Sequence, residues 1–198
     1  MSARAVAAVC LGGALCGCVA FESVPVAELG CDPALAGRWA PAGSDAADAI
    51  AIDNRCEAVV PGPKRSGAGA PQIRVQLRGF ELDSQRYLVF DKRDIEHLMG
   101  LGAEALVDSD LQALDKQVFL MRYRIEGDTL QAAMTDQAYA ADLVDEGRLP
   151  GKALAHNLSL IQADAGTVRA LLLQHPDLFV SEGRGSMELV RIAAGAAR

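Results

Sequence analysis

Apolar and polar residues alternate along several short stretches of the chain. Between residues 73 and 77, the apolar residues Ile73, Val75 and Leu77 alternate with polar ones, which is the period of a strand with one buried face. Similar stretches recur and are separated by turn residues, as at 54–55 and 126–128. The strands predicted in this way are 50–53, 56–60, 73–77, 87–90, 118–125, 129–134, 157–162 and 187–192.

The stretch 118–125 separates its side chains most clearly. One face is apolar and the other is basic, because successive side chains of a strand point to opposite sides. We expect the apolar face in the core and the basic face against water or a partner. The apolar face carries Phe119, Met121, Tyr123 and Ile125, and the basic face carries Arg122 and Arg124.

Three stretches with helical spacing are interposed between the predicted strands. They are 94–99, a helix that begins after the N-cap residue Asp136 and ends before Gly147, and 167–174. The hairpin turns are too tight for the crossovers that parallel strands need. The predicted fold class is therefore mainly β with interposed helices (α+β), with eight or nine strands in an antiparallel sheet rolled into a barrel or half-barrel.

The first residues have the pattern of a secretory signal. Arg4 supplies a basic start, and an apolar run follows that is shorter than the roughly 20 residues of a membrane-spanning helix. The run ends at Leu15-Cys16-Gly17-Cys18, which resembles the lipobox of bacterial lipoproteins. The resemblance implies that Cys18 receives a diacylglyceryl group and becomes the first mature residue. The alternative is an ordinary cleaved signal with incidental cysteines.

This resemblance implies a cellular location and a division of the chain into three segments. Val19 is not the aspartate that keeps some lipoproteins at the inner membrane, so the resemblance favours the outer membrane, facing the periplasm. We expect a signal peptide at 1–17, a lipidated N-terminus and tether at 18–30, and one globular β-rich domain at 31–198.

The five cysteines divide accordingly. Cys10 and Cys16 leave with the signal, Cys18 carries the lipid, and Cys31 and Cys56 remain as an even pair in an oxidising compartment. A disulfide between Cys31 and Cys56 is the simple prediction, and two separate thiols are the alternative. A metal site is less favoured, because neither cysteine has a second Cys or His nearby in the sequence.

The motif Gly37-Arg38-Trp39 contains the single tryptophan of the chain. It resembles the Gly-x-Trp that opens the first strand of lipocalins, a family that includes bacterial outer-membrane lipoproteins. The resemblance implies a lipocalin-like barrel in which Trp39 plugs the closed end and Arg191, from the last predicted strand, lies across it. The other interpretation is that Trp39 is simply the largest core residue of a small β domain.

Composition and charge exclude some functions. The formal net charge is −7, and the basic clusters are short, so nucleic acid is an improbable partner. The chain lacks Gly-x-Ser-x-Gly, His-Glu-x-x-His, P-loop and Cys-x-x-Cys motifs, and His97, His156 and His175 are far apart. We therefore expect no enzyme, no metal and no cofactor.

Three classes of function remain after these exclusions. The first is an envelope binding module for an apolar ligand, held in a cavity lined by Phe90, Phe119, Met121 and Tyr123. The second is a structural or inhibitor-type lipoprotein that binds an envelope protein through a sheet face. The third, less favoured, is an enzyme whose site is assembled from distant residues.

Overall fold

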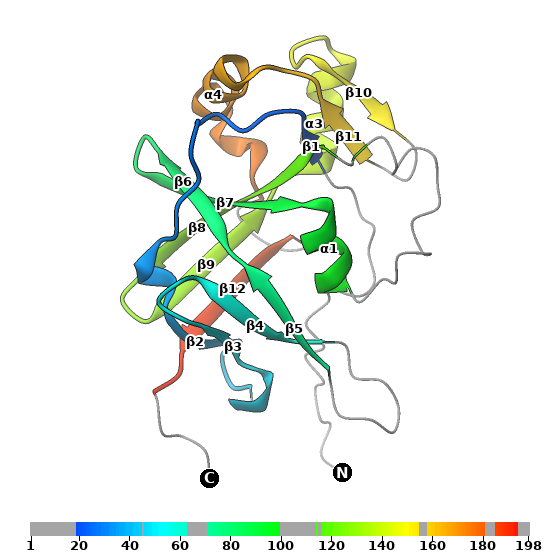
Figure 1. The fold of residues 1–198 in the computed structure, drawn as a ribbon. Helices are drawn as coiled ribbons and strands as arrows, with labels where there is room; N and C mark the ends of the chain where they lie inside the picture. The colour runs from blue at the N-terminus through cyan, green and yellow to red at the C-terminus, as the bar shows by residue number, and fades with distance from the viewer. Residues whose placement is uncertain are drawn as a thin grey trace, which may run out of the picture.

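The computed structural model describes residues 19–44, 46–62, 71–99, 114, 116–154, 158–180 and 185–193. These residues form one mainly β structure with interposed helices, as Figure 1 shows. Cys18 and His156 lie outside the described residues. The strands are β1 (Val19–Phe21), β2 (Gly37–Ala40), β3 (Ile50–Ile52), β4 (Glu57–Pro61), β5 (Gln72–Gln76), β6 (Arg78–Leu82), β7 (Gln85–Asp91), β8 (Val118–Glu126), β9 (Thr129–Met134), β10 (Gly151–Leu154), β11 (Leu158–Ile161) and β12 (Ser186–Arg191). The helices are α1 (Lys92–Met99), α3 (Gln137–Asp145) and α4 (Ala165–Gln174), with 3-10 turns η1 (Pro33–Leu35), η2 (Ala46–Asp48) and η3 (Pro176–Leu178).

The strands form one sheet with an open hydrogen-bonded path. Its order is β10-β11-β1-β8-β9-β12-β2-β3-β4-β5, and β6 and β7 lie off this path, with β7 paired to both β6 and β8. The pairs are antiparallel, as expected, except that β1 and β11 are parallel. The predicted α+β class is confirmed, and the path itself ends at β10 and β5.

Two apolar cores lie on the two faces of the sheet. Along β8, Phe119 and Tyr123 belong to the first core, whereas Leu120, which points the other way, belongs to the second. The second core is completed by helices α3 and α4, which contribute Leu143 and Leu171 among others. The apolar face predicted for 118–125 is therefore confirmed. The opposite face is only partly exposed as expected, because Leu120 on it is buried in the second core and the Arg122 guanidinium lies 5.1 Å from the centroid of the Phe179 ring.

Local signals account for the helix starts. The Asp136 carboxylate accepts the Tyr139 N–H at 3.1 Å, so the predicted N-cap of α3 is confirmed. Helix α1 begins at Lys92, earlier than predicted, because Asp91 and Asp94 each accept the backbone N–H of the other, at 2.9 and 3.0 Å. No helix within the described ranges is long and apolar enough to cross a bilayer.

Part of the tether expected over 18–30 belongs to the sheet. Val19–Phe21 form β1, which pairs with β8 on one side and with β11 on the other. Val19 and Phe21 are 1% and 0% exposed, and such burial contributes about 2 kcal/mol for each side chain. A three-residue strand that is buried on both faces shows no alternation in the sequence, which is why the pattern missed it.

Candidate functional site

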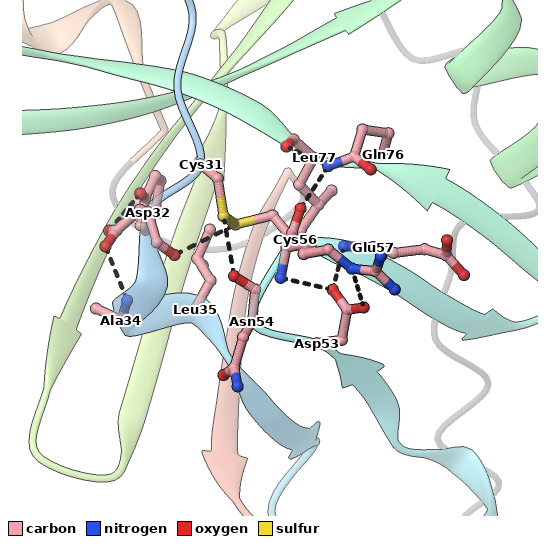
Figure 2. The surroundings of a disulfide bond; sticks show 12 residues. Cys31, Asp32, Ala34, Leu35, Asp53, Asn54, Cys56, Glu57, Gln76 and Leu77 are labelled. Carbon is pink, nitrogen blue, oxygen red and sulfur yellow. Dashed lines mark hydrogen bonds and ion pairs between the residues drawn. A yellow bond between two sulfur atoms is a disulfide. The ribbon is translucent and has the colours of Figure 1, made fainter.

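Cys31 and Cys56 form a disulfide bond, with their Cα atoms 5.7 Å apart (Figure 2). The pairing predicted from the number of cysteines is confirmed. Cys31 is exposed, whereas Cys56 is fully buried and has a φ of +61°, which is rare outside glycine. The bond joins the segment before η1 to the turn between β3 and β4.

The Asp53 carboxylate organises that turn. It accepts the backbone N–H groups of Arg55 and Glu57, both at 2.8 Å, and the Asp53 carbonyl accepts the N–H of Cys56 at 3.0 Å. The hydrogen bond from Glu57, followed by that from Arg55, lowers the pKa of Asp53 below its ordinary value. Leu77, which separates β5 from β6, donates its N–H to the Cys56 carbonyl at 2.9 Å. The turn that carries Cys56 is therefore held by hydrogen bonds to Asp53 within the turn and by a hydrogen bond from Leu77 outside it.

The chain around Asp32 is held against several strands. Gly30 and Gly79 of β6 exchange backbone hydrogen bonds of 2.8 and 2.9 Å, and Cys31 is held by the disulfide. At the end of η1, the Leu35 carbonyl accepts the indole N–H of Trp39 at 2.7 Å. Residues 30–35 therefore form a fixed wall along the strands rather than a loose loop.

Asp32 connects this wall to β7 and β8. Its Oδ1 accepts the Ala34 N–H at 2.9 Å and so caps η1. Its Oδ2 accepts the Tyr123 hydroxyl proton at 2.7 Å and lies 3.4 Å from Nη1 of Arg86. Burial, followed by the hydrogen bond to Asp32, raises the pKa of Tyr123 far above its ordinary value. Tyr123 therefore stays a neutral hydrogen-bond donor to the Asp32 carboxylate.

A groove of about 440 Å³ lies beside this cluster, and we call it the Asp32 groove. It runs between residues 26–35 on one side and β6, β7 and β8 on the other. Arg86 lies 3.8 Å from the Glu81 carboxylate at the rim, where the two side chains are 39% and 61% exposed. Its lining is partly apolar, with Val26, Leu35, Leu77, Phe80 and Leu88, and partly charged, with Glu28, Asp32, Glu81 and Arg86.

The four residues predicted to line an apolar cavity lie together on β7 and β8. Phe90 and Phe119 are neighbours across these strands, and each is 5% exposed in the first core. Met121 is partly buried against the same core, and Tyr123 is 5% exposed within it. Of the four, Tyr123 alone lines the Asp32 groove. The four predicted residues therefore lie together, but Phe90, Phe119 and Met121 pack within the first core and do not line the groove.

Trp39 and Arg191 also meet in the structure. Trp39 is 0% exposed, and the Arg191 guanidinium carbon lies 4.1 Å from the centroid of its ring. The two Nη groups of Arg191 donate to the carbonyls of Ala36 and Ala34 at 2.5 and 3.2 Å. Gly37 has a φ of +142°, and a Cβ there would overlap Nη1 of Arg191, so the glycine of the Gly-x-Trp motif makes room for the arginine.

The described histidines and the carboxylates at the start of α1 do not lie at the groove. His97 lies on α1 and His175 at the end of α4, and neither lines it. Among the described residues, no group of three His, Cys, Asp or Glu side chains is arranged to hold a metal ion. The carboxylates of Asp91 and Asp94 accept each other's backbone N–H groups at the start of α1.

Asp32 and Arg86 are the site residues that sequence reasoning missed. Asp32 precedes Pro33, and an Asp followed by Pro is a recognisable start of a helical turn, so η1 had a local signal. Arg86 had none, because its partner Asp32 lies on a distant segment that the fold alone brings near it.

Comparison with protein-family models, with curated proteins and with solved structures gave no match to this chain.

Proposed function

We propose that this chain is a lipid-anchored, non-catalytic binding module of the bacterial cell envelope, attached through Cys18 and facing the periplasm. The proposal gives the Asp32 groove the role of binding site. The observation that carries the binding role is the groove itself, because it combines a partly apolar lining with Asp32, which is positioned by its hydrogen bond from Tyr123 and its ion pair with Arg86.

The chemistry of the groove favours a ligand with an apolar body and a positive charge. Leu77 and Leu88 are nearly buried and offer apolar contact. Three carboxylates, those of Glu28, Asp32 and Glu81, face a single guanidinium, that of Arg86, so the lining has an excess of negative charge. An ammonium group beside an alkyl or aromatic group matches this lining, whereas an anion is repelled.

Two sources supply this chemistry. One is a small amphipathic amine, and the other is a basic side chain beside an apolar one on an envelope protein. The second source is favoured by the exposed position of Glu81 and Arg86 at the rim, where a protein surface can reach them. An apolar ligand between Phe90, Phe119 and Met121 is less well supported, because these side chains pack in the first core.

A matched series of probes tests the groove. Octylamine, octanol and octanoate share one chain and differ in charge, and the tripeptides Phe-Lys-Phe and Phe-Glu-Phe supply the protein-like arm. We expect octylamine or Phe-Lys-Phe to shift the backbone NMR signals of Arg86 and Tyr123, and the two anionic probes to leave them unchanged. Octanoate binding as tightly as octylamine would contradict the proposed chemistry.

Variants on the rim sharpen this test. The double change Glu28→Gln and Glu81→Gln is expected to weaken octylamine binding about threefold, as suits partly exposed ion pairs. Glu126→Gln is the matched control, since this exposed carboxylate at the end of β8 does not line the groove. If Glu126→Gln weakens octylamine binding equally, the amine does not bind in the Asp32 groove.

The anchoring part of the proposal rests on the lipobox. Cys18→Ala is expected to release the domain into the soluble periplasmic fraction, because the acyl chains supply the membrane affinity. Persistence in the membrane fraction after this change would contradict lipid anchoring. The chain's resemblance to lipoproteins favours the outer membrane as the site of attachment.

We also infer a lipocalin-like half-barrel as the finer description of the fold. Three features support it. The 3-10 turn η1 precedes Gly37-Arg38-Trp39, Arg191 of the last strand lies over Trp39, and β5 continues into β6 across the single residue Leu77. Strand β5 pairs with β4 at one end of the hydrogen-bonded path, whereas β6 pairs with β7, which lies beside β8 near the middle of the path. The continuous backbone from β5 to β6 therefore links the end of the sheet to its middle.

A further inference from the structure

Among the described residues, β1 begins at Val19, the residue that follows the proposed lipidation site Cys18. Val19 is the first residue of β1, and it pairs with Ser159 of β11. Adjacent Cα atoms across a trans peptide bond are about 3.8 Å apart. A lipid on Cys18 is therefore attached within one peptide unit of the folded sheet, and no flexible linker separates them.

Strand β1 is an internal strand and is well anchored. Its residues Ala20 and Phe21 pair with Phe119 and Val118 of β8, while Val19–Phe21 pair with β11. In the part of the chain that the structure describes, β1 is the only strand that links β10 and β11 to the rest of the sheet. A longer connection to the membrane would require the chain to leave both ladders and expose side chains that are at most 1% exposed.

We propose that the lipid anchor holds the domain directly against the bilayer, with the corner formed by β10, β11 and the start of β1 as the membrane-contacting surface. This inference rests on the proposed lipidation of Cys18. The occupant of this surface is the lipid bilayer. The acylated Cys18 directly precedes β1, so the chain between the anchor and the sheet is too short for another molecule to lie between this surface and the membrane.

Strand β10 supplies the exposed residues of this corner. Ala153 of β10 pairs with Ser159, which pairs with Val19, so Ala153 lies two strand spacings, or about 10 Å, from the start of β1. Lys152 and Ala153 are exposed, and β10 carries a lysine and no carboxylate in a chain whose net charge is −7. Lys152 offers a cation to anionic headgroups, while exposed carboxylates also lie near the corner, at Glu22 after β1 and at Asp142 and Asp145 on α3, which packs against β10.

The corner and the Asp32 groove lie on different parts of the molecule. In Figure 1, β1, β10 and β11 are at the upper right of the sheet, whereas the blue turn η1, which carries the wall of the groove, is at the lower left. Contact at the corner therefore leaves the groove open to the periplasmic space. The arrangement orients the proposed binding site toward soluble or neighbouring partners.

Site-specific quenching tests this orientation. A fluorescent amino acid at Ala153 reports on the corner, and the same probe at Asn54, in the exposed turn between β3 and β4, is the matched control. The lipidated full chain is bound to phosphatidylcholine–phosphatidylglycerol vesicles that contain a headgroup-linked quencher. We expect several-fold stronger quenching at Ala153 than at Asn54, and a probe at Lys152 repeats the measurement should the first probe disturb β10.

A spacer variant separates proximity from anchoring. About twelve Gly and Ser residues inserted between Cys18 and Val19 add about 20 Å of mean reach and leave the lipid in place. We expect this insertion to reduce the quenching at Ala153 to that at Asn54. Equal quenching without the spacer, in a chain whose mass shows an acylated Cys18, overturns the membrane-contact inference and leaves lipid anchoring intact. An unmodified Cys18 overturns both.

Discussion

Arg191 and Trp39 are directly paired residues of β12 and β2, and the guanidinium of the first covers the indole ring of the second at 4.1 Å. The same guanidinium donates to the carbonyls of Ala34 and Ala36, which flank the end of η1. One side chain of β12 thereby fixes the turn that precedes β2. The contact combines a cation–π interaction with charge-assisted hydrogen bonds.

Gly37 is the residue on which this arrangement depends. Gly37→Ala is expected to lower the free energy of unfolding by about 1–3 kcal/mol, because alanine strains the backbone at positive φ and its Cβ meets the Arg191 guanidinium. Gly166→Ala in α4 is the control, since the added Cβ has ordinary contacts there and should be neutral or stabilising. Urea unfolding measures both. An equal response of the two variants would contradict the role of Gly37.

Reduction of the disulfide is expected to destabilise the domain. The bond closes a loop between residues 25 apart in sequence, and a loop of this length stabilises by about 3 kcal/mol in the chain-entropy account. The double change Cys31→Ser and Cys56→Ser should lower the urea midpoint about as much as reduction does. If thiol-blocking reagents modify both cysteines in native, unreduced protein, the bond does not form in the cell.

Phe21 should behave as a core residue although it lies close to the proposed mature N-terminus. Phe21→Ala is expected to cost about 3–5 kcal/mol, because Phe21 is 0% exposed in the second core. Leu173→Ala, at an exposed position of α4, should cost less than about 0.5 kcal/mol. Thermal unfolding of the two variants compares them. A small effect at Phe21 would show that β1 is not an integral strand.

Asp53 gives the stability a defined dependence on pH. Backbone hydrogen bonds lower its folded-state pKa below the ordinary value of 3.8, so the unfolded chain takes up this proton at higher pH than the folded chain does. The stabilisation is present above the unfolded-state pKa and is lost as the pH falls through the folded-state pKa. The Tm difference between the native chain and Asp53→Asn should therefore be constant above about pH 5 and shrink below about pH 4. A difference that is the same at acid and neutral pH would contradict this origin.

Elements with local signals could be predicted from the sequence. The arms of the β8–β9 hairpin follow from alternation around a turn, and α3 follows from Asp136 and Gly147. Strand β1 could not be predicted, because its few residues are buried on both faces and its partners lie far along the chain. The parallel pairing of β1 with β11 is likewise a product of the tertiary fold.

The candidate site was predictable to a similar extent. The number of cysteines and the expected oxidising compartment predicted the pair Cys31 and Cys56, and the resemblance to lipocalins predicted that Arg191 meets Trp39. The Asp32 groove was not foreseen, because it depends on three carboxylates and Arg86 that come from separate segments. Charge alone did not distinguish these residues from solvated ones. Only the backbone path of residues 26–35 across β6 brings them together.

The attachment of lipid to Cys18 is the claim on which both the address and the orientation of the domain depend. Intact-mass spectrometry of the protein extracted from membranes tests it most directly. The account predicts a mature chain that starts at Cys18 and carries the added mass of a diacylglyceryl group. A chain of unmodified mass, or one that begins at another residue, would contradict it.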